Sequence, residues 1–454
     1  MDASTRLVRE LAAALSRGDD AARATRALGL LLERERVSRP AGDDEDIVRI
    51  LGPELAAQRL GPVAIREAVD LLLAHLSTVE VPAPGVIWAL TKSFDPRIVP
   101  HLAALLERIV DDPGHADVAA QLVVGLTCFF DPRSLAAVRI AAQRGHGDAR
   151  ESAARWLALH GGRSVSHSPA QRHLPSRTFD LEVDAYHLQG RAGTSTFLVN
   201  DGQDAVVVVD AASGRMLTRA RFSPGFAPDR PIRTWCLSAD GREAAVFPDG
   251  GQGSLVSLTG APALDLAAPP GALESLRYWW DEALLVSLGE VTTLWALSRH
   301  DGVAAFEPRR SLDVRRSHPG WMKQLDRLPP LRSRVLRTEP LQHRLLAYDH
   351  STPPGDLVVV GSAGDIEVRT PAPRFVPEVA YHAGCFYLLY DHEVQAVNVE
   401  GTLVDIFPAP DGVFLRALDI VLGPDPMLVV AASRFTTSRS SLVLSYALGP
   451  PAAH

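Results

Sequence analysis

Cysteine and lysine are the residues that this chain has least of. Its three cysteines, Cys128, Cys236 and Cys385, stand more than 100 residues apart, which excludes a disulfide framework and the close spacing of metal ligands. We expect them to be small, buried side chains. Only Lys92 and Lys323 are lysine among 46 basic residues, and such an arginine bias is typical of a GC-rich genome, which favours a bacterial source.

Long apolar runs are absent as well. The longest ones, such as 205–209, have the length of a strand, and residues 1–18 alternate apolar side chains with Arg and Glu instead of forming the apolar stretch of a signal peptide. We therefore expect a cytoplasmic protein with no membrane span. A formal net charge of −8 with a pI near 6.0 makes nucleic acid and anionic membranes unfavourable partners.

Sequence motifs of common enzymes are also missing. The chain has no Walker loop, no His-Glu-x-x-His helix, no Gly-x-Ser-x-Gly turn and no dinucleotide-binding glycine pattern. No catalytic residue, metal ligand or cofactor-binding residue is therefore assigned, and no cofactor is expected. If a site were built from scattered side chains instead, the residues to consider would be Asp281, Glu282, Asp349, His350, Asp391 and His392.

The length and composition predict two domains. The chain has 454 residues, too many for one hydrophobic core, and its 46% hydrophobic content is that of a globular protein. Residues 1–160 show the periodicity of short amphipathic helices, as in Leu7, Leu11 and Leu15. Residues 161–177 are rich in Gly, Ser, Pro and His, and they predict a solvated linker.

One internal repeat lies in the helical half. The octapeptide 90–97 (LTKSFDPR) matches 126–133 (LTCFFDPR) at a spacing of 36 residues, the length of a helical hairpin. In each copy Phe ends one helix, Asp caps the next, Pro occupies its first turn and Arg follows. Residues 148–159 resemble a helix of bacterial HEAT repeats. Together with the repeated octapeptide, this resemblance covers roughly residues 60–160, and it implies an α-solenoid.

A solenoid of this kind usually provides an extended surface that binds proteins. The other interpretation is that the helices only cap the second domain. We favour a docking surface, and both interpretations remain open at this stage.

The sequence pattern of residues 178–454 is typical of an all-β domain. Short apolar runs alternate with turn dipeptides, namely Asp201-Gly202, Asp240-Gly241, Asp301-Gly302, Glu400-Gly401 and Asp411-Gly412, which we interpret as hairpin turns. The segment 237–246 resembles the inner hairpin of WD-repeat propellers, and 209–215 resembles their strand-turn ending, although the signature Trp-Asp pairs are missing. The resemblance implies a β-propeller. A spacing of about 40 to 50 residues between similar segments predicts six or seven blades, and the need to pair open strand edges predicts closure by pairing of 178–188 with 441–446.

An arginine-rich stretch, 309–337, interrupts the regular spacing of the strands. Nine basic residues face only Asp313 and Asp326 there, a net charge of +7 in a chain of net charge −8. The stretch is either an insertion paired with the acidic body of the protein or a site for an anionic partner. The candidate partner-binding residues are Arg309, Arg310, Arg315, Arg316, Trp321, Lys323, Arg327, Arg332 and Arg334, followed by Arg337.

The leading functional hypothesis is a noncatalytic scaffold that binds one or more proteins through its helical and propeller surfaces. A second hypothesis is a propeller hydrolase or small-ligand sensor with a site in the central channel. A third is an accessory subunit of a larger ATPase or defence-type assembly, which rests on analogy of fold alone.

Overall fold

The protein was analysed as a computed structural model. The structure describes residues 3–18, 21–36, 45–56, 60–129, 131–160, 170–181, 188–191, 194–200, 204–226, 232–238, 240–248, 251–267, 275–280, 283–288, 291–300, 303–312, 333–339, 344–349, 355–361, 366–372, 378–390, 392–410, 413–434 and 441–448.

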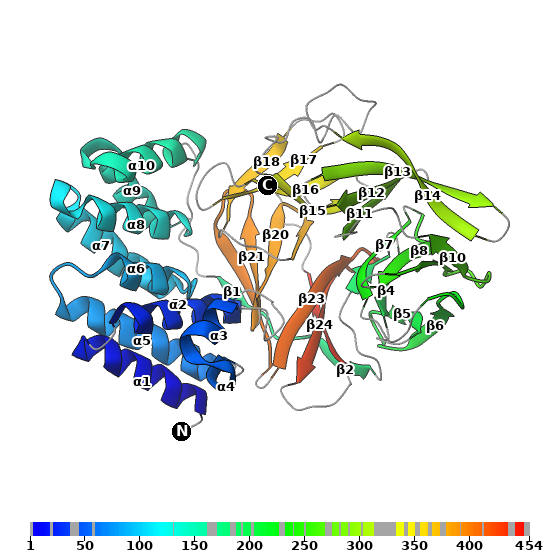
Figure 1. The fold of residues 1–454 in the computed structure, drawn as a ribbon, viewed down its shortest axis with the longest axis horizontal. Coiled ribbons are helices and arrows are strands. Elements are labelled where there is room, and N and C mark those ends of the chain that lie inside the picture. The colour runs from blue at the N-terminus through cyan, green and yellow to red at the C-terminus, as the bar shows by residue number, and fades with distance from the viewer. Residues whose placement is uncertain are drawn as a thin grey trace.

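The N-terminal part of the described chain is entirely helical (Figure 1). Its helices are α1 (Ala3–Arg17), α2 (Ala21–Arg36), α3 (Glu45–Leu51), α4 (Pro53–Ala56), α5 (Pro62–Thr78), α6 (Pro84–Thr91), η1 (Pro96–Ile98), α7 (Val99–Ile109), η2 (Pro113–His115), α8 (Ala116–Thr127), α9 (Pro132–Arg144) and α10 (Gly147–His160).

The longer helices pack in two rows. Helix α1 contacts α2 and α5, α2 contacts α6, α6 contacts α8, and α8 contacts α10, while α7 lies against both α8 and α9. One apolar core runs through the whole set, from Leu7 in α1 to Trp156 in α10. Each long helix therefore buries its apolar stripe against its neighbours in the two rows.

The repeated Asp-Pro turn forms as its sequence predicts. Asp95 precedes η1 and accepts a hydrogen bond from the backbone of Arg97 (3.0 Å), and Asp131 precedes α9 and accepts one from Arg133 (2.8 Å). Pro96 and Pro132 occupy the first helical turn, where a missing N–H costs nothing. The predicted capping arrangement is confirmed in both copies.

All regular structure after residue 170 in the described chain is β-strand. The strands are β1 (Gln171–Arg172), β2 (Arg177–Leu181), β3 (Leu188–Gly190), β4 (Thr196–Asn200), β5 (Ala205–Asp210), β6 (Met216–Arg221), β7 (Ile232–Leu237), β8 (Glu243–Pro248), β9 (Gly253–Ser257), β10 (Leu264–Ala267), β11 (Ser275–Trp280), β12 (Ala283–Leu288), β13 (Val291–His300), β14 (Val303–Leu312), β15 (Ser333–Glu339), β16 (Arg344–Asp349), β17 (Asp356–Val360), β18 (Ile366–Pro371), β19 (Val379–His382), β20 (Cys385–Leu389), β21 (Glu393–Asn398), β22 (Leu403–Pro408), β23 (Val413–Val421), β24 (Met427–Arg434) and β25 (Ser441–Ala447).

These strands form antiparallel meanders arranged as a β-propeller. The sheet orders are β3-β4-β5-β6, β15-β16-β17-β18, β1-β22-β21-β20-β19, β2-β25-β24-β23 and an eight-stranded sheet β11-β12-β13-β14-β10-β9-β8-β7. The first strands of successive meanders contact one another in turn, β7 with β11, β11 with β15, β15 with β19, β19 with β23, and β23 with β3. They therefore surround one axis.

The number of blades differs from the sequence prediction. The described strands form five sheets where six or seven blades were expected. The reason is that two consecutive meanders, β7 to β10 and β11 to β14, share one sheet. Strand β14 pairs in parallel with β10, with Leu266 opposite Ala304, so two units that the spacing suggested as separate are joined edge to edge.

Ring closure follows the predicted pairing. Strand β2 lies antiparallel to β25, with Arg177 opposite Ser445 and Leu181 opposite Ser441, and β24 pairs with the other side of β25. The first and last parts of the propeller chain therefore share one sheet. This confirms the pairing of the segments around 178 and 441.

Two predicted turns have different outcomes. Asp240-Gly241 lies between the paired strands β7 and β8, with Leu237 opposite Ala244, so the predicted inner hairpin is confirmed. Asp411-Gly412 falls between β22 and β23, which belong to different sheets, so the prediction of a hairpin there is wrong. An Asp-Gly dipeptide favours a turn but does not specify which strands flank it.

The structure describes residues 170–177 of the segment between helices and propeller. Gln171 and Arg172, expected to be linker, form β1, which adds in parallel to the outer strand β22. His173 follows, with its Nε2 2.7 Å from Asp405 Oδ1 and its ring stacked on Phe407 at 5.0 Å. These contacts attach the connecting segment to one sheet of the propeller.

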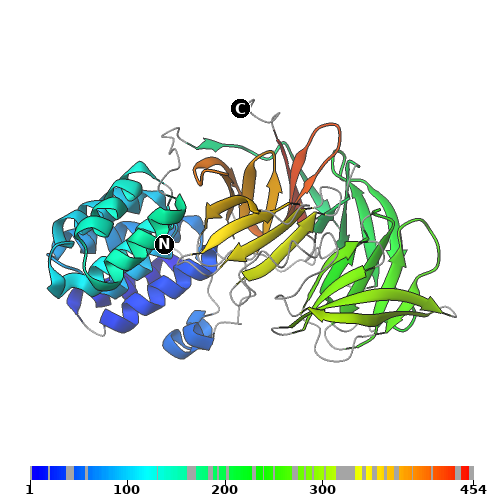
Figure 2. The same ribbon diagram turned by 90° about the horizontal axis from the view of Figure 1, so that it is seen from above.

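The helices lie to one side of the propeller. Figures 1 and 2 show from two directions that the sheet containing β20 and β21 faces the helical stack and that the eight-stranded sheet lies away from it. No helix among the described residues is both long and apolar enough to cross a lipid bilayer.

Candidate interaction face

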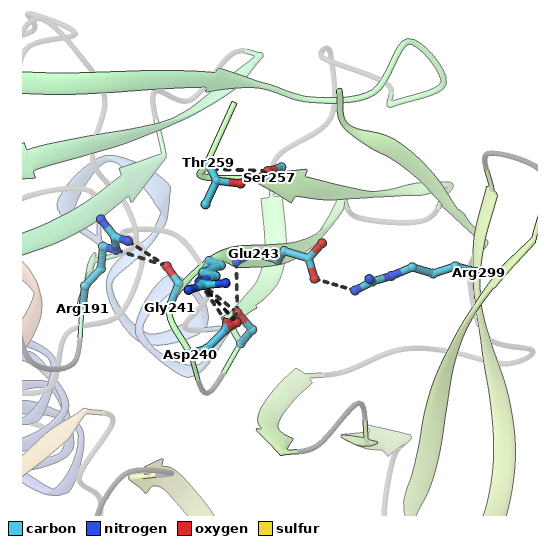
Figure 3. Close-up of polar contacts among 9 residues, drawn as sticks. Arg191, Asp240, Gly241, Glu243, Ser257, Thr259 and Arg299 are labelled. Atoms are coloured by element: carbon cyan, nitrogen blue, oxygen red, sulfur yellow. Dashed lines mark hydrogen bonds and ion pairs between the residues drawn. The ribbon is translucent and has the colours of Figure 1, made fainter. Parts of the chain in front are cut away.

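A polar network surrounds the turn between β7 and β8 (Figure 3), and it lies at the ends of four strands, β3, β7, β8 and β13, from two sheets. We call it the turn network, and its residues are Arg191, Ser238, Asp240, Gly241, Arg242, Glu243 and Arg299.

The turn itself is fixed by its own side chains. Ser238 Oγ donates to Asp240 Oδ1 (2.6 Å) and accepts from the backbone N–H groups of Arg242 and Glu243 at 3.2 and 3.0 Å. Gly241 has φ +67°, the left-handed conformation that side chains other than glycine rarely adopt. These bonds hold the turn in one conformation.

This arrangement lowers the pKa of the Asp240 carboxyl group. Although partial burial acts in the opposite direction, hydrogen bonds from Ser238 and from the backbone of Arg242 hold the pKa of Asp240 below its ordinary value. The turn therefore presents a negative charge beside the exposed guanidinium of Arg242.

Two arginines connect this turn to other elements. Arg191, which follows β3, donates from Nε and Nη2 to the carbonyl oxygen of Gly241 at 3.2 and 3.0 Å. Arg299, near the end of β13, forms an ion pair with Glu243 at the start of β8. The first contact joins two sheets and the second joins the two meanders of the eight-stranded sheet.

Two carboxylates, one buried and one half-buried, make similar contacts between the first strands of other sheets. Asp419 in β23, which is 2% exposed, accepts a hydrogen bond from the backbone N–H of Gly190 in β3 at 2.7 Å. Glu378, just before β19, accepts one from Leu418 N at 3.1 Å. These side chains replace backbone pairing between neighbouring sheets, so their role is structural.

The helices contact the propeller through a different set of residues. Phe94, from the turn after α6, belongs to an apolar cluster of propeller residues, and its ring centroid is 6.0 Å from that of Tyr390. His392 Nε2 lies 3.1 Å from the carbonyl oxygen of Leu60, and its ring contacts Phe414 at 5.3 Å. Tyr390 and His392, on either side of the β20–β21 turn, thus contact two connections of the helical region, those that hold Leu60 and Phe94.

This contact decides the role of one suspected catalytic residue. His392 is buried between the two parts of the protein and its ring lies within hydrogen-bonding distance of a backbone carbonyl of the helical region. Its role is therefore to hold the helical region against the propeller. Asp349 lies at the end of β16. Asp281, Glu282, His350 and Asp391 lie outside the described residues, and no grouping of these six residues is shown.

The predicted arginine-rich stretch is only partly described. Arg309 and Arg310 belong to β14, while Arg334 and Arg337 belong to β15 in another sheet. The stretch therefore begins and ends as strand and connects two sheets. The remaining candidates, Arg315, Arg316, Trp321, Lys323, Arg327 and Arg332, lie outside the described residues.

The three cysteines are free and unlinked. Cys236 is buried, as predicted, whereas Cys128 and Cys385 are half-buried. Burial raises the pKa of the Cys385 thiol to about 11 and that of Cys128 to about 12, so both remain protonated at neutral pH. Within the described chain, no group of three or more His, Cys, Asp or Glu residues could hold a metal ion.

Sequence reasoning identified the Asp240-Gly241 turn but missed Arg191 and Arg299. Arg191 is separated from Gly241 by 50 residues and Arg299 from Glu243 by 56. No local pattern indicates such pairs, because they depend on which sheets become neighbours.

Comparison with known proteins gives one likeness of fold. The chain matches no protein-family model and no curated protein. Among solved structures it is similar to the β-propeller domain of Cps50 (Swd1) from Myceliophteria thermophila, at 12% identity and a TM-score of 0.38, over 61% of this chain and 99% of that chain. The propeller assignment rests on the sheet topology described above.

Proposed function

We propose that the protein is a noncatalytic scaffold that binds other proteins on its helical and propeller surfaces. The observation that carries the proposal is the buried contact between the two parts. Phe94 of the helical region lies in a cluster with Leu357, Val379 and Tyr390 of the propeller. Such contacts hold two surfaces of different kinds in one molecule.

The helical region, residues 1–160, is proposed to be a HEAT-like α-solenoid. Two features support this: the two-row packing, in which α2, α6, α8 and α10 contact one another in turn, and the Asp-Pro turn that recurs at 36 residues. Stacked hairpins of this kind provide an extended surface for protein partners. The propeller, residues 178–454, supplies the second surface.

The turn network favours binding over catalysis. Its charged groups, Arg191, Asp240, Arg242, Glu243 and Arg299, are bonded to one another or to backbone atoms. They can provide ion pairs and hydrogen bonds at the rim of an interface, where charges guide association and select partners. The arginine-rich stretch would add a positive surface for an anionic protein segment.

The proposal places the protein in the cytoplasm. Three free thiols suit a reducing compartment, since disulfides are rare there. Under this proposal it needs no cofactor, and its partners are proteins and not nucleic acids, because the chain carries a net charge of −8.

Affinity purification with surface variants tests the proposal. The full-length chain is compared with Arg242→Glu/Arg299→Glu, which changes the turn network, and with Arg150→Glu/Arg155→Glu, which changes exposed positions of α10. Partners from the native host are quantified by mass spectrometry. We expect each double variant to lose a different subset of partners while its circular dichroism spectrum is unchanged.

Two results would contradict the scaffold. One is the absence of any protein that co-purifies above a control with an unrelated chain. The other is a large thermal shift caused by a metal ion or small cofactor and removed by a chelator or by dialysis, which would support a ligand site.

A further inference from the structure

Strand β6 is an edge whose second side is not paired with any described strand. It is the outermost strand of the sheet β3-β4-β5-β6 and pairs only with β5 in the described part of the molecule. Five of its six residues are exposed, and the sixth is half-buried. A strand in this position presents a row of backbone donors and acceptors to solvent.

Apolar side chains lie on this edge together with arginines. Met216 is 49% exposed and Leu217 is 44% exposed, and they are consecutive in the chain. The pairing of β6 with β5 shifts by one residue here: Val208 lies opposite Thr218 and Val209 lies opposite Met216, so Leu217 is an extra residue in β6. The shift is a β-bulge, and it brings Met216 to the same face of the strand as Arg219.

The charge of the edge is positive. Arg219 Nη2 lies 2.8 Å from Asp204 Oδ1, and Arg221 Nε lies 3.8 Å from Asp204 Oδ2. One carboxylate thus faces two guanidinium groups, and Arg215 precedes the strand as a third, exposed arginine. The side chain of Arg221 is 80% exposed, so it can reach an incoming carboxylate.

The same propeller already adds strands to two comparable edges. Strand β1 pairs with the outer strand β22, with Gln171 opposite Asp405, and β14 pairs with the outer strand β10, with Asp265 opposite Val303. Both additions are parallel. The outer edges of these sheets therefore have a geometry that accepts an additional strand.

We propose that β6 binds an extended acidic segment of a partner protein, which adds to the sheet as a fifth strand. The backbone of the segment would supply the hydrogen bonds, its apolar side chains would cover Met216 and Leu217, and its carboxylates would pair with Arg215, Arg219 and Arg221. This inference rests on the proposed scaffold function and gives it a site and a partner chemistry.

Random nine-residue peptides displayed on phage, selected against the immobilised full-length chain, test this proposal. We expect enrichment of peptides in which Asp or Glu alternates with apolar residues. The strongest peptide is then synthesised with a fluorescein label, and its affinity is measured by fluorescence anisotropy. Added salt should weaken binding, because exposed ion pairs are screened.

Variants of the edge locate the binding site. Arg219→Glu/Arg221→Glu should weaken binding about tenfold or more, because two attractive pairs become repulsive. Arg242→Glu/Arg299→Glu carries the same change of charge at the turn network and should bind the peptide as the unmodified chain does.

Either of two results would overturn the proposal. One is a selection that yields no acidic, alternating peptides. The other is a selected peptide that binds the edge variants as tightly as the unmodified chain, which would mean that the arginines and the bulge only protect the edge from aggregation. Partners that co-purify normally with Arg219→Glu/Arg221→Glu would leave the scaffold function intact and assign it to other surfaces.

Discussion

Phe94 shows how one residue of a repeated turn takes a second role. It has φ +48°, a left-handed conformation that costs of order 1–3 kcal/mol for a residue other than glycine. The ring is 6% exposed and lies in a cluster with Tyr390 and other propeller residues. Burial of an aromatic ring there offsets the unfavourable backbone conformation.

Replacing Phe94 with Ala should uncouple the two parts of the protein. The expected loss of stability is about 3–5 kcal/mol, as for other buried Phe→Ala changes, and the helical and β signals should separate into two transitions. Urea denaturation followed by far-UV circular dichroism and tryptophan fluorescence measures this. Val63→Ala, at a side chain that is 70% exposed, is the matched control. A single transition with unchanged midpoint would show that Phe94 does not couple them.

Asp210 gives a prediction of pH dependence. Hydrogen bonds from the side chain and backbone of Ser213, both 2.7 Å long, hold the pKa of Asp210 below its ordinary value of 3.8. Because the folded-state pKa is the lower one, the stabilisation is complete above the unfolded-state pKa and is lost as the pH falls through the folded-state pKa.

The variant Asp210→Asn isolates this contribution. Its unfolding free energy should lie below that of the unmodified chain near pH 6, and the difference should shrink toward about pH 3. Urea titrations at several pH values measure it. A difference that stays constant over this range would mean that the carboxylate charge has no part in holding the turn.

Among the helices, the contact between α2 and α6 depends on one glycine. A Cβ atom at Gly29 would lie 2.1 Å from Cζ3 of Trp88, much closer than two carbon atoms can approach. Trp88 is in addition covered by Arg26 and Lys92, whose charged groups lie 4.9 and 5.4 Å from its ring. The ring therefore has little freedom to move away.

Gly29→Ala should destabilise the helical region by about 1–3 kcal/mol through overpacking, although alanine favours a helix over glycine by about 1 kcal/mol. Thermal and urea denaturation measure the change. Gly61→Ala is the control, since a Cβ there meets no atom within 4 Å. Adding Trp88→Leu to Gly29→Ala should restore part of the loss, and a double variant less stable than the single one would contradict the steric explanation.

The patterns of single elements predicted much of the fold. Apolar periodicity predicted the helices of residues 1–160. The match between 90–97 and 126–133 predicted the helix caps at Asp95 and Asp131. Local turn chemistry carried this information. The parallel pairing of β10 with β14 could not be predicted, because no residue pattern within either strand specifies a partner in another meander.

At the scale of the whole molecule, the candidate sites were harder to predict than the architecture. The pairing of β2 with β25 followed from the need of a propeller to close. No sequence pattern predicted the contacts of Arg191, Phe94 and His392, because each contact joins elements that are distant in sequence. The excess of positive charge in 309–337 predicted a binding segment or an insertion. In the structure this segment begins in β14 and ends in β15.

Removing residues 441–454 tests ring closure. The truncation deletes β25, which leaves β2 and β24 without the strand between them. We expect aggregation or loss of soluble protein, because open strand edges pair with other chains. Size-exclusion chromatography with light scattering measures this. A chain ending at residue 448 keeps β25 and should remain as soluble as the full chain; a folded, monomeric protein lacking 441–454 would contradict the closure.

The same pairing sets an order of events during synthesis on the ribosome. Ser176, beside β2, bonds to Ser445, which is 269 residues later in the chain. At roughly 5–20 residues per second, about 13–54 s pass between the synthesis of β2 and the synthesis of its partner strand β25. The helical region is complete long before that. It can therefore fold first and stand beside an unfinished ring, and in that interval a chaperone would find β2 and the other unpaired strands accessible.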